Sequence, residues 1–279
     1  MARLFQQPLV YALLGFGAFL GLTLHADNFR GPGSAPTHDR VVISSPVLTA
    51  LYGGDRFLAA NLETIRLSAT GMDGGRTDDF YLLRAHKVVS ELNACHENNY
   101  YLANALLTWG GAVDEGGNIL EHATLCRHWD ELPPFLLGFN HFFFDKNIHE
   151  AQRWLEIAAQ RADHNADSFR NFAIAIEVEQ IEDEKIALDM LKRERTNART
   201  ARLASMLDKR IVRLEGLAIL RDAQRRFEAE TGKPLSHPQE LIATSILEQF
   251  PQDPMRLGYE FAEGRFRMKK VRVAGVEER

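Results

Sequence analysis

The sequence predicts a mainly α protein in which short antiparallel helix pairs stack into an irregular solenoid. Three observations support this fold class. Between residues 45 and 196, apolar residues recur at three- and four-residue steps, in segments separated by a few polar residues. A segment without proline follows at residues 197–231 and predicts one long helix that closes the stack. An apolar run near the start of the chain predicts a transmembrane helix.

The apolar run covers residues 4–24 and contains no acidic or basic side chain. As a helix it would measure about 31 Å, close to the ~30 Å hydrocarbon core of a bilayer. We therefore expect residues 1–26 to form a transmembrane anchor through which the protein contacts the membrane. Because Arg3 lies on the short side, the expected location is the bacterial inner membrane, single-pass, with the bulk of the chain periplasmic. A cleaved signal peptide that releases the chain into the periplasm is the alternative.

The rest of the chain divides by composition. Residues 27–44 are rich in Gly, Pro and Ser and predict a flexible linker. Residues 45–196 form the helical repeat domain, which begins at Ser45-Pro46 with serine as N-cap and proline at the first helical position. Residues 197–231 are the long closing helix. Residues 232–279 form a small C-terminal α/β tail, in which Glu263-Gly264 predicts the turn of a β-hairpin.

Apolar positions also mark the individual helices. Asp55 is expected to cap the second helix of the domain, and a further helix is expected over about residues 118–129. The apolar residues of the helix after Asp55 are Phe57, Leu58, Leu62, Ile65 and Leu67. Aromatic residues at helical spacing are expected in the core rather than in a ligand site; they are Tyr100, Tyr101, Trp109, Trp129, Phe135, Phe139 and Trp154.

The clearest helix pair spans residues 133–162. Its first helix carries Leu137-Gly138 and Phe142-Phe143; its second carries Glu150-Ala151, Trp154-Leu155 and Ala158-Ala159. This pattern resembles a tetratricopeptide repeat, which places a small residue where its two helices cross and large residues in the surrounding holes. The resemblance implies a solenoid of such units, because one helix pair cannot bury its own apolar faces.

A second resemblance covers about residues 225–266. The chain runs from Phe227 through Gly232-Lys233-Pro234 and Gln239-Glu240-Leu241 to Pro251-Gln252-Asp253-Pro254 and a strand with Tyr259. This order resembles the end of the long helix and the start of the globular part of type II secretion pseudopilins. The resemblance implies the fold of this segment, with Tyr259 packed inward. Met255-Arg256-Leu257 replaces the glycine that pseudopilins carry after Asp-Pro, and the prepilin leader is absent, so neither pilus assembly nor calcium ligands are transferred.

Composition limits the function classes. A net charge of −5 gives no basic surface for nucleic acid. The two cysteines, Cys95 and Cys126, are too few for a disulfide scaffold, but a bridge between them is compatible with the periplasm and stays open. His122 and Cys126 have legitimate zinc spacing on one helix face, with Cys95, His96 and His128 as further candidates. The alternative is a core cysteine among surface histidines, and no catalytic residue, metal or cofactor is predicted.

The acidic run at residues 177–184 has no ordered calcium-ligand spacing and predicts a solvated loop. Taken together, the anchor, linker, irregular repeats and tail resemble membrane-anchored tetratricopeptide-type proteins found beside bacterial envelope systems. The expected function is therefore a non-enzymatic, membrane-anchored scaffold or adaptor that binds a protein partner through a groove between stacked helices, in a bacterial envelope assembly related to secretion or pili. The alternative is a periplasmic metal-binding protein or enzyme that uses His122 and Cys126.

Overall fold

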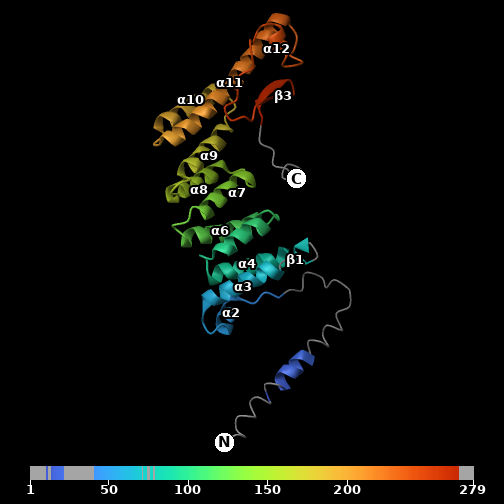
Figure 1. The fold of residues 1–279 in the computed structure, drawn as a ribbon, viewed down its shortest axis with the longest axis vertical. Helices are drawn as coiled ribbons and strands as arrows, with labels where there is room; N and C mark the ends of the chain where they lie inside the picture. The colour runs from blue at the N-terminus through green and yellow to red at the C-terminus, as the bar shows by residue number, and fades with distance from the viewer. Residues whose placement is uncertain are drawn as a thin grey trace.

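Helices dominate the structure, a computed structural model that describes residues 11, 14–21, 41–70, 72–73, 76–77 and 79–269. From α2 onward they follow one another along the long axis of the molecule to α12 at the far end (Figure 1). Strands occur in this described part as two short antiparallel hairpins. The prediction of a mainly α fold with a small antiparallel hairpin near the C-terminus is confirmed.

The helices alternate with short connections. In chain order the elements are α2 (Ser45–Leu51), α3 (Arg56–Thr70), β1 (Met72–Asp73), β2 (Arg76–Thr77), α4 (Asp79–Leu92), α5 (Glu97–Ala103), the π-helix η2 (Asn104–Thr108), α6 (Val113–Cys126), α7 (Leu132–Phe143), α8 (Ile148–Arg161), α9 (Ala166–Val178), α10 (Glu184–Asn197), α11 (Ala201–Thr231), α12 (Glu240–Ala243), β3 (Tyr259–Ala262) and β4 (Arg265–Met268). Helix α6 begins five residues before the start predicted from the sequence, and α11 begins at Ala201 rather than at residue 197.

Buried apolar side chains form successive clusters along the described array. The largest cluster joins α2 to α7 and receives Trp154 from α8. Two small clusters lie among α7, α8 and α9. Another joins α10 and α11 to the C-terminal tail. Each cluster is built mostly by neighbouring elements, as expected when helices are stacked in chain order.

Helices α7 and α8 approach closely at Gly138. A Cβ atom on Gly138 would lie 2.9 Å from the Cγ atom of Leu155 and 3.0 Å from the carbonyl oxygen of Ala151. Ala151, Leu155 and Leu137 are almost completely buried at this crossing. A glycine therefore sets the distance between the two helices, because any side chain would push them apart.

The tail closes one side of α11. The β3–β4 hairpin pairs Phe261 with Phe266, and Phe266 is buried in the same cluster as α11. The Tyr259 hydroxyl donates to the carbonyl oxygen of Arg213 at 2.9 Å. Its ring fits against Gly216, where an added Cβ atom would lie only 2.1 Å from the hydroxyl oxygen. Gly216, in the middle of α11, therefore leaves the space in which Tyr259 of the tail packs.

The localisation predicted from the sequence is wrong. Among the described residues, no helix combines the length and the apolar character needed to cross a bilayer. Within the predicted span of residues 4–24, the structure describes Tyr11 and a helical stretch at residues 14–21. The other residues of the span, and residues 27–40 of the predicted linker, lie outside the described residues.

Candidate functional site

Helix α3 leaves large apolar side chains uncovered at the end of the array. Leu58, Leu62 and Ile65 recur at four- and three-residue steps and so lie on one face of the helix. They are 43%, 39% and 65% exposed, and the neighbouring Phe57 is 57% exposed. A contiguous patch of large exposed apolar side chains often marks a surface that contacts a protein, a ligand or a membrane. We call these four residues of α3 the open face.

The opposite face of α3 explains this arrangement. Its residues Ala59, Ala60, Thr64 and Leu67 are buried in the structure, together with Glu63. Two adjacent alanines allow α3 and α4 to approach closely, and the buried carboxylate of Glu63 is paired with Arg66. The small-residue face therefore packs inward, and the bulkier residues point away from the core. The apolar residues predicted for this helix are thus mostly on the surface, with Leu67 as the exception.

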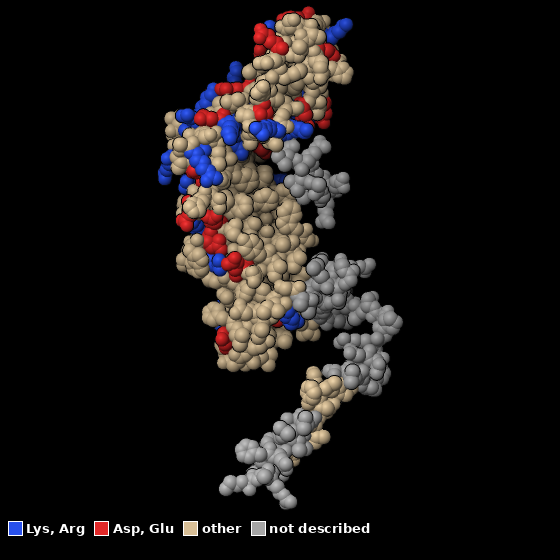
Figure 2. Space-filling model, viewed as in Figure 1, with Lys and Arg blue, Asp and Glu red and all other residues tan. Residues whose placement is uncertain are grey.

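Charged residues are unevenly distributed over the visible surface. Figure 2 shows Lys, Arg, Asp and Glu gathered over α9, α10 and α11, and a broad area without these residues over the middle of the array. Ion pairs between exposed side chains are typical of the charged region, for example Arg195 with Asp208 and Lys192 with Glu215. The open face belongs to the end of the molecule that is remote from this charged region (Figure 1).

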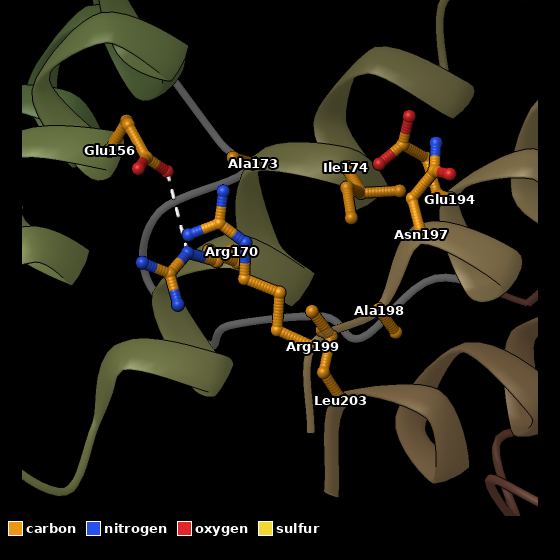
Figure 3. Close-up of a pocket in the computed structure, with 9 residues that line it drawn as sticks. All are labelled: Glu156, Arg170, Ala173, Ile174, Glu194, Asn197, Ala198, Arg199 and Leu203. Atoms are coloured by element: carbon orange, nitrogen blue, oxygen red, sulfur yellow. Dashed lines mark ion pairs between the residues drawn. The ribbon is translucent and has the colours of Figure 1, made fainter. Parts of the chain in front are cut away.

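A pocket of about 270 Å³ lies where α8 and α9 meet the connection between α10 and α11. Glu156, Arg170, Glu194 and Arg199 are its charged lining residues. In Figure 3 the Arg199 side chain reaches toward Arg170, which is paired with Glu156, whereas Glu194 lies at the other side of the pocket. We call this site the arginine pocket.

The geometry of the arginine pocket comes from the consecutive helices α8 and α9 and from the connection between α10 and α11. Arg170 is on α9 and its Nε atom lies 3.6 Å from Glu156 of α8. Arg199 stands between α10 and α11, directly before the N-cap Thr200. The hydroxyl of Thr200 donates to Asp167 of α9 at 2.8 Å and fixes this connection against α9. The arginine side chains are therefore positioned by a seam between two packed units, a common location for binding sites.

The cysteines of the proposed metal cluster form a disulfide. Cys95 and Cys126 are bridged, with their Cα atoms 5.3 Å apart. A bridged sulfur has no thiolate to offer a metal ion, so Cys126 cannot act with His122 in the way the alternative function requires. The ring of His122 contacts the Ser90 hydroxyl at 3.3 Å. No group of three potential metal ligands occurs among the described residues.

Arg127, next in the chain to Cys126, connects the elements around the disulfide. Its guanidinium donates to the carbonyl oxygen of Cys95 at 3.1 Å, to Glu97 at 3.0 Å and to Asp130 at 2.8 Å. Asp130 also accepts the hydroxyl proton of Tyr100 at 3.0 Å. Burial alone would raise the pKa of Asp130, but the Leu132 N–H and its partners Arg127 and Tyr100 lower that pKa below the ordinary value. The network is thus a structural tie between α5 and the end of α6.

The aromatic residues expected in the core divide into three groups. Phe135 and Phe139 are half-buried. Tyr100 and Trp154 are buried, as predicted. Tyr101, Trp109 and Trp129 are 41%, 40% and 64% exposed, so the prediction is wrong for them. The acidic run at residues 177–184 falls at the end of α9, in the connection that follows and at the first residue of α10, where Asp183 caps α10 by accepting from two backbone N–H groups.

Sequence reasoning singled out neither arginine of the pocket. Arg170 and Arg199 are 29 positions apart, counted as 199 minus 170, and no motif connects them. The open face was visible only as apolar spacing, because periodicity does not reveal which side of a helix faces the core. Comparison with known proteins finds no matching family model, no matching curated protein and no matching solved structure.

Proposed function

We propose that the protein is a non-enzymatic scaffold that binds a protein partner, and that the partner docks on the open face of α3. The observation that carries this proposal is the exposure of Phe57, Leu58, Leu62 and Ile65 at the end of a helical array. In a stack of helices each apolar face is covered by the next helix, and terminal units normally turn a polar face outward. Here the terminal unit turns an apolar face outward instead.

The energetics of the open face favour a partner. Complete burial of a Leu, Ile or Phe side chain stabilises a structure by about 1.5–3 kcal/mol. Side chains that are already half-covered would each gain roughly 1 kcal/mol when a partner covers the remainder. Several such contributions in one contiguous patch are typical of the central part of a protein–protein interface.

Two further features support a tetratricopeptide-like scaffold of the bacterial cell envelope. The glycine at the α7–α8 crossing agrees with a tetratricopeptide-like unit, because that repeat needs a small residue where its helices meet. The Cys95–Cys126 bridge is typical of proteins in oxidising compartments. Together with the pseudopilin-like order of the tail, these features support a scaffold in an assembly of the bacterial cell envelope.

Site-specific photo-cross-linking tests the proposal. A benzophenone amino acid replaces Ile65 on the open face in the full-length protein, expressed in the cells that naturally make it. The matched control carries the same amino acid at Ile219, which is 50% exposed on α11. We expect a discrete adduct with one other protein from position 65 and none from position 219, as read by mass spectrometry.

Loss of the patch should remove this adduct. With the cross-linker placed at Phe57, the double substitution Leu62→Ser with Ile65→Ser should lower the yield of the adduct several-fold, because the apolar contact is lost. Substitution of Leu125 by Ser, a 75% exposed residue on α6, should leave the yield unchanged. An absence of discrete adducts from position 65, or adducts only between copies of this chain, would contradict a scaffold that binds a different protein at α3.

A further inference from the structure

The arginine pocket contains two guanidinium groups that make few hydrogen bonds to the described residues. Arg199 makes no hydrogen bond or ion pair with any residue that the structure describes, and its side chain projects into the pocket in Figure 3. The Arg170 side chain is 28% exposed, and among the described residues its one ion pair, with Glu156, is long at 3.6 Å. A guanidinium group has five N–H donors, so most of the donors of both arginines are available to a ligand.

The chemistry of the pocket selects a carboxylate among the common anions. Guanidinium groups bind carboxylates through paired, charge-assisted hydrogen bonds. The first turn of α11 begins directly after the pocket at Ala201 and adds a partial positive charge. Glu156 and Glu194 line the same pocket, so the net charge of its two arginines and two glutamates is zero. The two carboxylates repel a monoanion about half as strongly as a phosphate dianion at the same position, so the pocket favours a carboxylate over such a phosphate.

The apolar lining indicates that the carboxylate belongs to a polypeptide. Ile174 and Leu203 line the pocket beside the arginines. A small inorganic anion has no apolar group to contact them, but the neighbours of an acidic residue in a peptide do. The volume of about 270 Å³ suits one or a few side chains rather than a large cofactor.

We propose that the arginine pocket binds a carboxylate group of a partner polypeptide, with Arg170 and Arg199 as the two guanidinium donors. The carboxylate comes either from an acidic side chain or from the end of a chain, and the chemistry of recognition is the same. This assignment rests on the proposed function only in naming a protein as the source of the ligand. It gives the scaffold a second, charged contact site, separate from the open face.

Titration of the full-length protein with small peptides tests the assignment. The first probe is acetyl-Leu-Glu-Leu-amide, which carries only a side-chain carboxylate, and its neutral match is acetyl-Leu-Gln-Leu-amide. The second probe is acetyl-Leu-Ala-Leu with a free terminal carboxylate. Binding is read from the arginine Nε–Hε resonances in ¹⁵N NMR spectra, assigned through the variants Arg170→Gln and Arg199→Gln. We expect saturable shifts of both resonances with at least one carboxylate probe, and the stronger probe identifies the source.

Three variants sharpen the test. Arg199→Gln should weaken binding of the stronger probe by at least about 10-fold, the effect of losing one charge-assisted hydrogen-bond pair. Arg226→Gln, an exposed arginine elsewhere on α11, should have no effect. Glu156→Gln should strengthen binding several-fold, because it removes the carboxylate that competes for Arg170. A purely structural role of Glu156 would not produce this gain.

The assignment is overturned if the neutral peptide shifts the resonances as strongly as the carboxylate probes, or if neither carboxylate probe gives saturation. Tighter binding of inorganic phosphate than of either carboxylate probe would also overturn it. These measurements use the isolated protein, whereas the scaffold proposal is tested by cross-linking at α3. A negative titration with a positive cross-link therefore removes only the arginine pocket, and the reverse result removes only the open face.

Discussion

The two ends of the helical array differ in how the apolar faces of their outer helices are covered. At the C-terminal end, α11 receives the tail, which covers its apolar face with Phe266 and Leu241, and the remaining surface is rich in charge. At the N-terminal end, α3 has no such cover among the described residues and exposes apolar side chains. A stack of helices needs a cap at each end. One cap is built into the chain, and in the function we propose a partner protein supplies the other.

The internal cap depends on a buried charge. Arg213 of α11 and Asp253 of the tail have 10% and 2% of their side chains exposed, and Arg213 Nε lies 3.1 Å from Asp253 Oδ2. The N–H group of Arg213 Nε does not point along this line, so the contact is an ion pair rather than a directed hydrogen bond. Asp253 also accepts from the backbone N–H groups of Met255, Leu257 and Gly258. One carboxylate thereby organises the whole Pro-x-Asp-Pro corner.

The largest expected effect comes from removal of this carboxylate. Asp253→Ala should lower the free energy of unfolding by about 3–5 kcal/mol, because Arg213 is left as an uncompensated buried charge. The midpoint of urea unfolding provides the measurement. Asp208→Ala breaks the exposed ion pair with Arg195 and should leave the midpoint almost unchanged. Equal effects of the two substitutions would mean that the tail is not held by its buried pair.

At the N-terminal end, a disulfide bond rather than a buried ion pair is expected to stabilise the fold. Reduction of the Cys95–Cys126 bridge should lower the free energy of unfolding by about 3–4 kcal/mol, because the bridge closes a loop with a sequence separation of 31 residues. Thermal unfolding with and without a phosphine reductant measures the effect, and Cys95→Ser with Cys126→Ser should reproduce it. If the doubly substituted protein still responds to reductant, the loss of stability has another origin.

A smaller effect on stability is expected from a substitution in the middle of the array, where α7 crosses α8. Gly138→Ala should cost about 1–3 kcal/mol, because the added methyl group meets Leu155 and the Ala151 carbonyl and forces α7 and α8 apart. Gly117→Ala on α6 is the matched control. No atom lies within 4 Å of its added Cβ, so this substitution should stabilise the protein by roughly 0.5–1 kcal/mol. Opposite signs for the two glycines are the expected result in chemical denaturation.

The sequence was sufficient for most of the helices and for the C-terminal hairpin, and the physical reasons are local. Apolar spacing and caps act within a few residues, as does the Glu263-Gly264 turn; Asp55, for example, accepts from the backbone N–H groups of Phe57 and Leu58. The prediction of Ser45 as N-cap is wrong by one residue, because Ser44 takes that position and Ser45 begins the helix. The open face was not predictable, because α3 has apolar residues on more than one side and the adjacent Ala59 and Ala60 decide which side packs. That choice depends on the shape of α4, which no local pattern contains.

The candidate sites were less predictable than the helices for the same reason. Arg170 and Arg199 become neighbours only when α9 packs beside the start of α11. The Cys95–Cys126 pairing likewise needed the distance between the α4–α5 connection and the end of α6. Conversely, the zinc-like spacing of His122 and Cys126 was a real local pattern with no chemical consequence, because the disulfide occupies the sulfur. Local signals identify elements, whereas sites arise from contacts between elements.

The smallest expected effect is a pH dependence of stability that comes from the N-terminal end of the array. Burial lowers the pKa of His86 on α4 below its ordinary value of 6.5, although its hydrogen bond to Asn99 raises it somewhat. Between this lowered pKa and about 6.5, the unfolded chain therefore binds more protons than the folded protein. The stability contributed by neutral His86 is complete above pH 6.5 and is lost as the pH falls below it, by at most about 1.4 kcal/mol per pH unit.

Urea unfolding at pH 7.5 and pH 5.5 measures this slope. His86→Gln should flatten it, because the substituted side chain binds no proton in either state, whatever its effect on absolute stability. His237→Gln, at an exposed position before α12, should leave the slope unchanged. An unchanged slope in His86→Gln would show that acid acts elsewhere in the molecule. A flattened slope would assign the acid sensitivity to the end of the array that carries the open face, where a buried imidazole lies one helix away from the surface that a partner would cover.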